Sequence, residues 1–316
     1  MITKGNNLVV KPVLTHQSPP LDPYLDDEKK GLLYGVAAVL LWGLTFIFVK
    51  KGVECAHPLV FTLFRLAIAL PFMFFFRPKH SLIVLLSVTI VWNLGSFNLM
   101  ALAMGYGVNA STAAFLQQTN TLFLILLSVV FLKEKMPTSV FISLPVAFVG
   151  LYIFFGGGSL LTNVSLGLVF VLGGALASAF GMLLLKKFKV GGSVSTVVWL
   201  AGLGALIQGP LVWFSVPGEE IVFSAQAFGY GAGAFVLSNV FASFFWLKST
   251  QVLKGASLSH ILFLIPLTVL AIDFFVMGAQ IQVEHLVGGA VILLASSLRF
   301  VKIFRKKPVL KVSKET

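Results

Sequence analysis

Ten apolar stretches, each long enough to cross a lipid bilayer, fill most of the chain between Gly31 and Lys302. A helix needs about 20 apolar residues to cross the hydrocarbon core. With 58% hydrophobic and only 11% charged residues, against about 25% charged in a soluble domain, the chain cannot cover its apolar surface in water. The sequence therefore predicts an all-α integral membrane protein. The predicted transmembrane helices are 31–49, 58–76, 82–104, 110–132, 137–156, 165–185, 193–215, 226–247, 258–279 and 285–302.

The two ends of the chain are polar and differ from the spans. Residues 1–30 carry several prolines and lack an apolar core followed by a small-residue cleavage site, so they are not typical of a cleaved signal peptide. We expect a disordered cytoplasmic leader over residues 1–30 and a cytoplasmic tail over residues 303–316.

The positive charges fall in alternate connections. The leader, the even-numbered connections and the tail hold 19 of the 23 Lys and Arg residues, whereas the odd-numbered connections hold only Lys50 and Lys51. Cytoplasmic connections of membrane proteins are enriched in Lys and Arg, so we expect both termini in the cytoplasm. An error in the number of spans would scramble this alternation. The skew also explains the net charge of +12 without nucleic-acid binding.

The second five spans echo the first five. Gly31–Lys51 aligns without a gap on Gly167–Lys187, at an offset of 136 residues. Because each half holds an odd number of spans, the halves are expected to lie in opposite orientations. The sequence thus predicts two inverted five-helix repeats, a transporter architecture with its binding site near the midplane. Further matches follow in order at growing offsets: Pro71 with Pro210, Asn93 with Asn239, and Ala110-Ser111 with Ala256-Ser257.

Several short motifs make the chain resemble the drug/metabolite transporter superfamily, in its EamA-type ten-helix branch. They are Leu41-Trp42-Gly43-Leu44-Thr45-Phe46 through Lys50-Lys51, Pro58 through Phe64-Arg65, Ala101-Leu102 to Ala113-Ala114, and Phe131-Leu132-Lys133-Glu134. The resemblance covers residues 31–302 and implies EamA-like five-helix repeats over 31–156 and 165–302. It also implies a secondary transporter of the bacterial cytoplasmic (inner) membrane, with an amino acid or a related amphipathic metabolite as cargo. One departure is Gln280, where the family often has an acidic residue.

Polar side chains inside the spans are the candidates for substrate binding, because a polar group buried in lipid is costly unless it is paired. The repeat places Asn93 and Asn239 at equivalent depths in the two halves. Gln117 and Asn120 lie three residues apart and so share a helix face. For all four residues, contact with a substrate and hydrogen bonding between helices are both open.

Four further residues are candidates with an open alternative each. Trp42 lies mid-span and either forms an aromatic wall of the site or packs against a neighbouring helix. His260, in the first turn of the ninth span, either titrates at the site or is solvated at the membrane surface. Arg65 either attracts anionic substrates or extends to the lipid headgroups. Asp273, a carboxylate well inside a span, is a candidate for proton coupling or for a structural role.

Other functional classes find less support in the residues. The chain has no nucleotide-binding loop of the G-x-x-x-x-G-K-[ST] type, and its single cysteine, Cys55, excludes a thiolate metal cage. We predict no catalytic residue, no metal and no cofactor. The alternatives are a channel or scaffold subunit and, with less support, an intramembrane enzyme. The predicted partners are a small-molecule metabolite and the lipid bilayer, without nucleic acid, for a monomer or weak homo-oligomer that works by alternating access.

Overall fold

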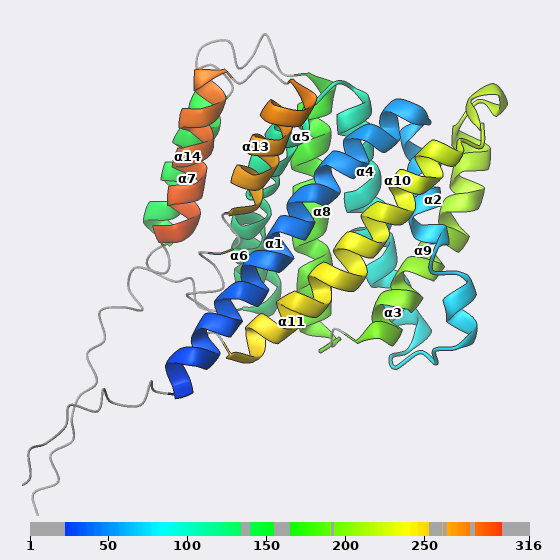
Figure 1. The fold of residues 1–316 in the computed structure, drawn as a ribbon, viewed down its shortest axis with the longest axis horizontal. Helices are drawn as coiled ribbons and strands as arrows, with labels where there is room; N and C mark the ends of the chain where they lie inside the picture. Colours follow the sequence, from blue (N-terminus) through cyan, green and yellow to red (C-terminus); the bar gives the residue numbers. More distant parts are fainter. Residues whose placement is uncertain are drawn as a thin grey trace, which may run out of the picture.

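The computed structural model describes residues 23–133, 140–154, 165–190, 193–252, 261, 264–278 and 282–298. These residues form helices and turns, with no strand among them. The helices pack side by side and run between two end faces of the molecule (Figure 1). This arrangement confirms the predicted all-α class for the described part of the chain.

In the first half of the chain, short breaks divide the predicted spans. α2 is followed by the 3₁₀ turn η1 at Pro71, where the ring removes a backbone donor, and α5 is separated from α6 by two turn residues. The bounds are α1 (Pro23–Cys55), α2 (Pro58–Ala67), η1 (Pro71–Phe74), α3 (Leu82–Val88), η2 (Thr89–Ser96), α4 (Phe97–Gly105), α5 (Ala110–Gln117), α6 (Asn120–Leu132) and α7 (Val140–Phe154).

In the second half, serine side chains mark where three helices begin. Ser165, Ser193 and Ser224 precede α8, α9 and α10, and each hydroxyl accepts a hydrogen bond from the backbone N–H three residues later. Such a contact satisfies one of the free donors of the first turn. The bounds are α8 (Leu166–Lys187), α9 (Val194–Ser215), η4 (Gly218–Glu220), α10 (Ala225–Phe235), η5 (Val236–Ala242), α11 (Ser243–Val252), α13 (Leu264–Met277) and α14 (Val283–Leu298).

Six helical units of the described residues are long and apolar enough to span a membrane. They are 29–55, 82–105, 110–132, 166–187, 194–215 and 225–249. The other four predicted spans coincide with shorter apolar helices, 58–74, 140–154, 264–277 and 283–298. The total of ten spans therefore stays a prediction.

The start of α1 differs from the expectation for the leader. The predicted disordered segment ended at residue 30, but the helix begins at Pro23. Proline is tolerated in the first turn of a helix because its missing N–H would have no intrahelical partner there. The first 22 residues of the predicted leader and the predicted tail lie outside the described residues.

The two halves do not form separate units, because helices of each half pack against helices of the other half. α1 contacts α10, α11 and α13, whereas α8 contacts α4, α5 and α6. α2 lies against α9, and α7 against α14. Small residues allow close approach: a Cβ atom on Gly181 would lie 2.4 Å from Cβ of Trp92, and one on Gly288 would lie 2.4 Å from the backbone nitrogen of Phe154.

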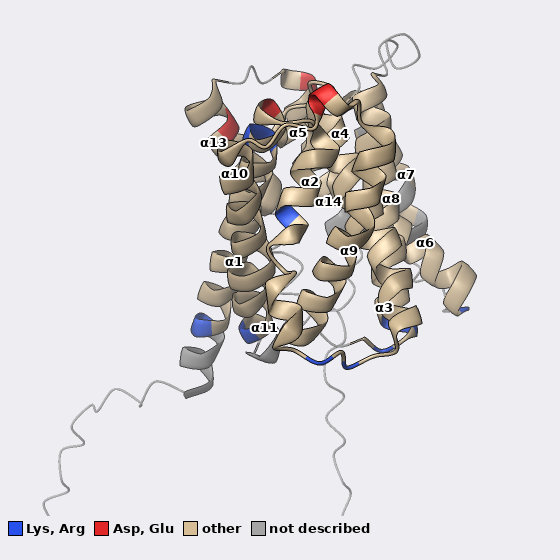
Figure 2. Ribbon diagram, turned by 90° about the vertical axis from the view of Figure 1, so that its right-hand side faces the viewer, with Lys and Arg blue, Asp and Glu red and all other residues tan. Residues whose placement is uncertain are grey.

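Charged side chains gather at the two ends of the bundle. Figure 2 shows acidic residues at the end near α5 and α13, and basic residues along the opposite end near α11 and α3. The long sides carry many exposed large apolar side chains, such as Leu40, Ile90 and Leu206 in the middle stretches of their helices. An apolar girdle between two charged ends is the surface expected of a protein that sits in a bilayer.

Candidate functional site

Two π-helical segments interrupt otherwise continuous helices, one in each half. η2 (Thr89–Ser96) lies between α3 and α4, and η5 (Val236–Ala242) lies between α10 and α11. Adding the repeat offset of 146 to the bounds of η2 gives 235–242, which coincides with η5 within one residue. Asn93 and Asn239 therefore each lie in a wide turn, in the register that the predicted repeat expects. Turns of this kind are rare in proteins, and those that occur are frequently found at functional sites.

Side-chain hydroxyl groups bond to backbone carbonyls in and around these wide turns. The Ser243 hydroxyl donates to the carbonyl of Ser238 at 3.0 Å, within the π turn itself. The Thr89 hydroxyl donates across to the carbonyl of Leu200 on α9 at 3.2 Å. Because free carbonyls are costly in lipid, these bonds help to keep the irregular backbone in the bundle.

The predicted residue Arg65 lies next to η5 and away from the lipid surface. Its side chain is only 7% exposed, and its Nη2 donates to the Ser238 hydroxyl at 3.2 Å. That hydroxyl lies 2.6 Å from Oδ1 of Asn239. The structure thus links two of the predicted residues, Arg65 and Asn239, through one serine that joins the two halves.

Asn93 has a different environment from its counterpart. It is 5% exposed, and its side chain forms no hydrogen bond with the part of the chain that the structure describes. It faces α9, where a Cβ on Gly204 would lie 3.8 Å from its own Cβ. Its amide is therefore a buried polar group that forms no hydrogen bond between the described helices.

A second polar pair, Asn98 and Gln208, bonds one side chain to the other across two helices. Nδ2 of Asn98 on α4 donates to Oε1 of Gln208 on α9 at 2.9 Å, and Nε2 of Gln208 donates back to Oδ1 of Asn98 at 3.0 Å. Gln208 also donates to the carbonyl of Leu59 on α2 at 2.9 Å. This arrangement holds three helices together and uses both N–H donors of Gln208.

Asp273 is buried beside the first turn of α5. Its side chain is 2% exposed, and Oδ2 accepts from both the backbone N–H and the hydroxyl of Ser111, at 2.9 and 2.5 Å. The positive end of the α5 dipole also favours a carboxylate there. These contacts give the buried carboxyl group two hydrogen-bond donors, in a described part of the chain where no Lys or Arg side chain forms an ion pair with it. The predicted role of Asp273 in coupling stays a prediction.

The remaining predicted residues are described by other contacts. Trp42 packs against Trp246 with ring centroids 5.3 Å apart, which favours the packing alternative. Gln117 and Asn120 lie at the break between α5 and α6. Oε1 of Gln117 is buried and has no hydrogen-bond partner in the described structure. His260 lies outside the described residues.

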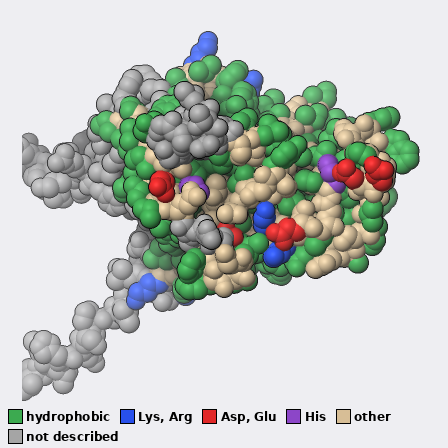
Figure 3. Space-filling model, turned by 90° about the horizontal axis from the view of Figure 1, so that it is seen from above, with side chains coloured by type: hydrophobic (Ala, Val, Ile, Leu, Met, Phe, Trp, Pro, Cys, Tyr) green, Lys and Arg blue, Asp and Glu red, His purple; other side chains and the backbone are tan. Residues whose placement is uncertain are grey.

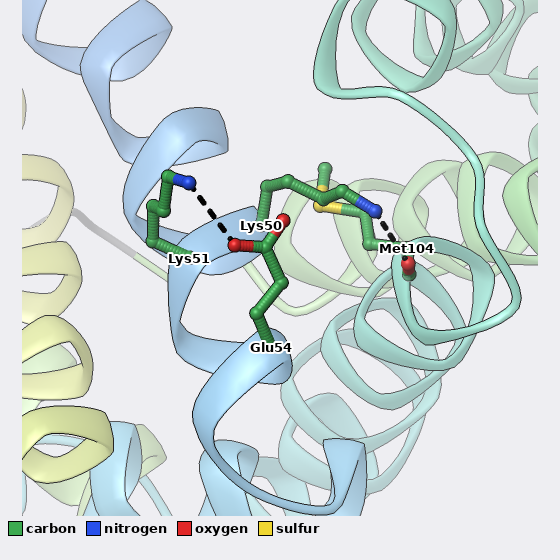
Figure 4. A network of polar contacts seen from close by, with 4 residues as sticks. All are labelled: Lys50, Lys51, Glu54 and Met104. Atoms are coloured by element: carbon green, nitrogen blue, oxygen red, sulfur yellow. Dashed lines mark hydrogen bonds and ion pairs between the residues drawn. The ribbon is translucent and has the colours of Figure 1, made fainter. Parts of the chain in front are cut away.

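The acidic end of the bundle carries a small polar network and an open cavity. Lys50 donates to the carbonyl of Met104 at 3.0 Å, and Lys51 forms an ion pair of 3.1 Å with Glu54 (Figure 4). The cavity, of about 400 Å³, lies between the end of α1 and the end of α4, with Glu54 and Tyr106 in its wall. Figure 3 shows acidic, basic and histidine side chains on this face.

Sequence reasoning missed Ser238, Asn98, Gln208 and Ser111. Asn98 and Gln208 lie inside predicted spans, so the same test of polar residues in lipid would have found them. The serines give no such signal, because a hydroxyl can bond to the carbonyl of its own helix. Among the described residues, no group of three His, Cys, Asp or Glu side chains could hold a metal ion.

Comparison with known proteins gives the family of the first half of this bundle. The EamA-like transporter family model matches residues 29–156. The chain carries an EamA-like transporter domain. The matched residues run from within α1 to the end of α7 and include Arg65 and Asn93. With the long apolar helices, it makes the chain a multi-pass membrane protein.

Three relatives are named as transporters or pumps. A probable amino-acid metabolite efflux pump of Salmonella typhimurium strain LT2 is 26% identical over 181 residues, 55% of this chain and 60% of that protein. Another of that name, from Escherichia coli strain K12, is 27% identical over 192 residues, 60% of this chain and 63% of that protein. The matches thus span less than two thirds of these two pumps. The uncharacterized transporter YoaV of Bacillus subtilis strain 168 is 24% identical over 284 residues, 83% of this chain and 94% of that protein.

A solved crystal structure shares the fold. It superposes with a TM-score of 0.56 at 13% sequence identity, over 88% of this chain and 99% of the other. The match extends well beyond the EamA-like domain and so includes much of the second half of the chain.

Proposed function

We propose that the chain is a secondary transporter that carries a small organic metabolite across the cytoplasmic membrane by alternating access between two inverted repeats. The names of two relatives, probable amino-acid metabolite efflux pumps, support an amino acid or a related amphipathic compound as cargo. The observation that carries the proposal is the reciprocal packing of the two halves.

Each half packs its π-helical segment against the first helix of the other half. η2 contacts α8, and η5 contacts α1. The same exchange holds for the fourth helix of each half, because α5 and α6 contact α8 while α13 contacts α1. α2 and α9, which correspond in the repeat, contact each other. This pattern is the one expected of two similar units related by a two-fold axis, and rocking of one unit against the other would open the interface from either side.

The substrate site of this carrier lies between η2 and η5. Asn93 and Asn239 supply amide groups that both donate and accept hydrogen bonds, which suits the amino and carboxylate groups of a metabolite. Gln117 and Asn120 lie at the break of the fourth helix and extend the polar surface. The charge skew between the ends supports the predicted orientation, with both termini in the cytoplasm.

The test uses purified protein in proteoliposomes with counterflow of a panel of radiolabelled amino acids. Asn93→Ala and Asn239→Ala are each expected to lower the initial rate of exchange about three- to tenfold, because each removes a hydrogen bond worth about 0.5–1.5 kcal/mol. Ser87→Ala is the matched control, since among the described residues its hydroxyl bonds to the carbonyl of Ile83 in the same helix. Its exchange rate should equal that of the wild type.

The outcome against the site is unchanged exchange in both asparagine variants. The outcome against the function is the absence of exchange for every compound of the panel in the wild type. Monodispersity and helical content of each variant, measured before reconstitution, separate a lost contact from a lost fold.

A further inference from the structure

Arg65 is a buried cation at the interface of the two halves. Of the Lys and Arg side chains that the structure describes, that of Arg65 is the one that is buried, with 7% of its surface exposed. The guanidinium carbon lies 4.0 Å from the centre of the Phe97 ring, and Nη2 donates to the hydroxyl of Ser238 on η5. The Arg65 backbone is also closely packed, because a Cβ on Gly231 of α10 would lie 3.0 Å from its backbone nitrogen. The charge therefore lies inside the bundle, against Phe97 of α4 and Ser238 of η5.

The charge of Arg65 has no anionic partner among the described residues. The ion pairs formed there join Lys51 to Glu54 and His57 to Glu220. The Nε atom of Arg65 is buried and has no hydrogen-bond acceptor. Its neighbour Ser238 is neutral, and the hydroxyl proton of that serine is shared between the carbonyl of Ala234 at 2.7 Å and Oδ1 of Asn239 at 2.6 Å. A buried ion in this state is strongly disfavoured unless a counter-charge arrives.

We propose that Arg65 is the receptor for the carboxylate group of a monocarboxylate metabolite. A guanidinium presents paired N–H donors in a plane that matches the two oxygens of a carboxylate. A single buried cation balances one negative charge, which favours a carboxylate over a phosphate dianion. Phe97 offers an apolar surface beside that group. This inference rests on the proposed transport function, because it assigns the charge chemistry of the same site.

A substitution at Ser238 can place a carboxylate beside Arg65 without any added ligand. Ser238→Asp places a carboxylate beside the Arg65 guanidinium, and Ser238→Asn is its neutral counterpart of equal size. The melting temperature of each purified protein is measured without ligand and in the presence of L-leucine, 4-methylpentanoate or L-leucinamide. Of these three compounds, only the first two carry a carboxylate.

In the wild type, both carboxylates at saturation should raise the melting temperature by about 2–4 °C, and the amide should not. Arg65→Gln should lose this response. Ser238→Asp should melt above Ser238→Asn and respond to no carboxylate, because its own carboxylate occupies Arg65. Should Arg65→Gln fail to fold, the two Ser238 variants still decide.

The proposal is overturned if the wild type responds to neither carboxylate, if the amide stabilises as well as the acid, or if Ser238→Asp melts below Ser238→Asn. Counterflow separates this result from the function. Exchange of uncharged or cationic compounds without a response to carboxylates contradicts the Arg65 site alone. A response to carboxylates without any exchange contradicts transport and leaves the site standing.

Discussion

Asp273 shows at the scale of one residue how a carboxylate can be buried in an apolar bundle. Its oxygen accepts two hydrogen bonds from Ser111, which lies 162 positions away in the chain. Asp273→Ala should lower the free energy of unfolding by about 1.5–3 kcal/mol, the range for hydrogen bonds to charged groups, and Ser111→Ala by less because the backbone N–H still donates. Denaturant or thermal unfolding of both single variants and the double variant gives the coupling between them. Additive effects would contradict the contact, and Glu284→Ala, at an exposed carboxylate, should change little.

At the scale of elements, η2 and η5 are the irregular segments of two otherwise regular helices. Their wide turns depend on side-chain hydroxyls and on packing against the other half, so their backbone N–H groups should open more readily. Hydrogen exchange at 93–97 and 239–243 should be about tenfold faster than in the middle of α9, corresponding to an opening free energy about 1.4 kcal/mol lower. α9 (Val194–Ser215) is the internal reference because it is continuous over a similar length. Equal protection in all three segments would exclude the π-helical segments as points of flexibility.

At the scale of the whole molecule, a labelling experiment can measure the predicted orientation in the membrane. Tyr106 contacts Phe170 in the first turns of α8, and Phe188 follows the end of that helix, so these residues lie about 27 Å apart along it. In a Cys55→Ser background, Tyr106→Cys should react with a membrane-impermeant maleimide in intact cells, whereas Phe188→Cys should react only after permeabilisation. Both native side chains are exposed, at 57% and 39%, so access alone does not separate them. The reverse pattern would place the termini outside the cell.

The residues of the bundle differ in how far the sequence could predict their roles. The equivalence of Asn93 and Asn239 follows from the repeat offset, and the structure places both in π-helical segments. The π turns themselves carry no local signal, because neither segment contains a proline. The partners of Arg65 and Asp273 were also beyond prediction, since each lies more than 160 positions away in the chain.

The sequence by itself determined that this chain is a helical membrane protein, and it predicted where the spans lie and that the two halves are related. These properties are local, because the transfer of each segment into lipid depends on its own side chains and on the length of helix that crosses the core. Only the tertiary structure decided which polar groups are satisfied and which are left free. The amide of Gln208 is fully engaged while the Nε atom of Arg65 is not. That difference depends on which helices approach one another, and contacts between distant segments determine it.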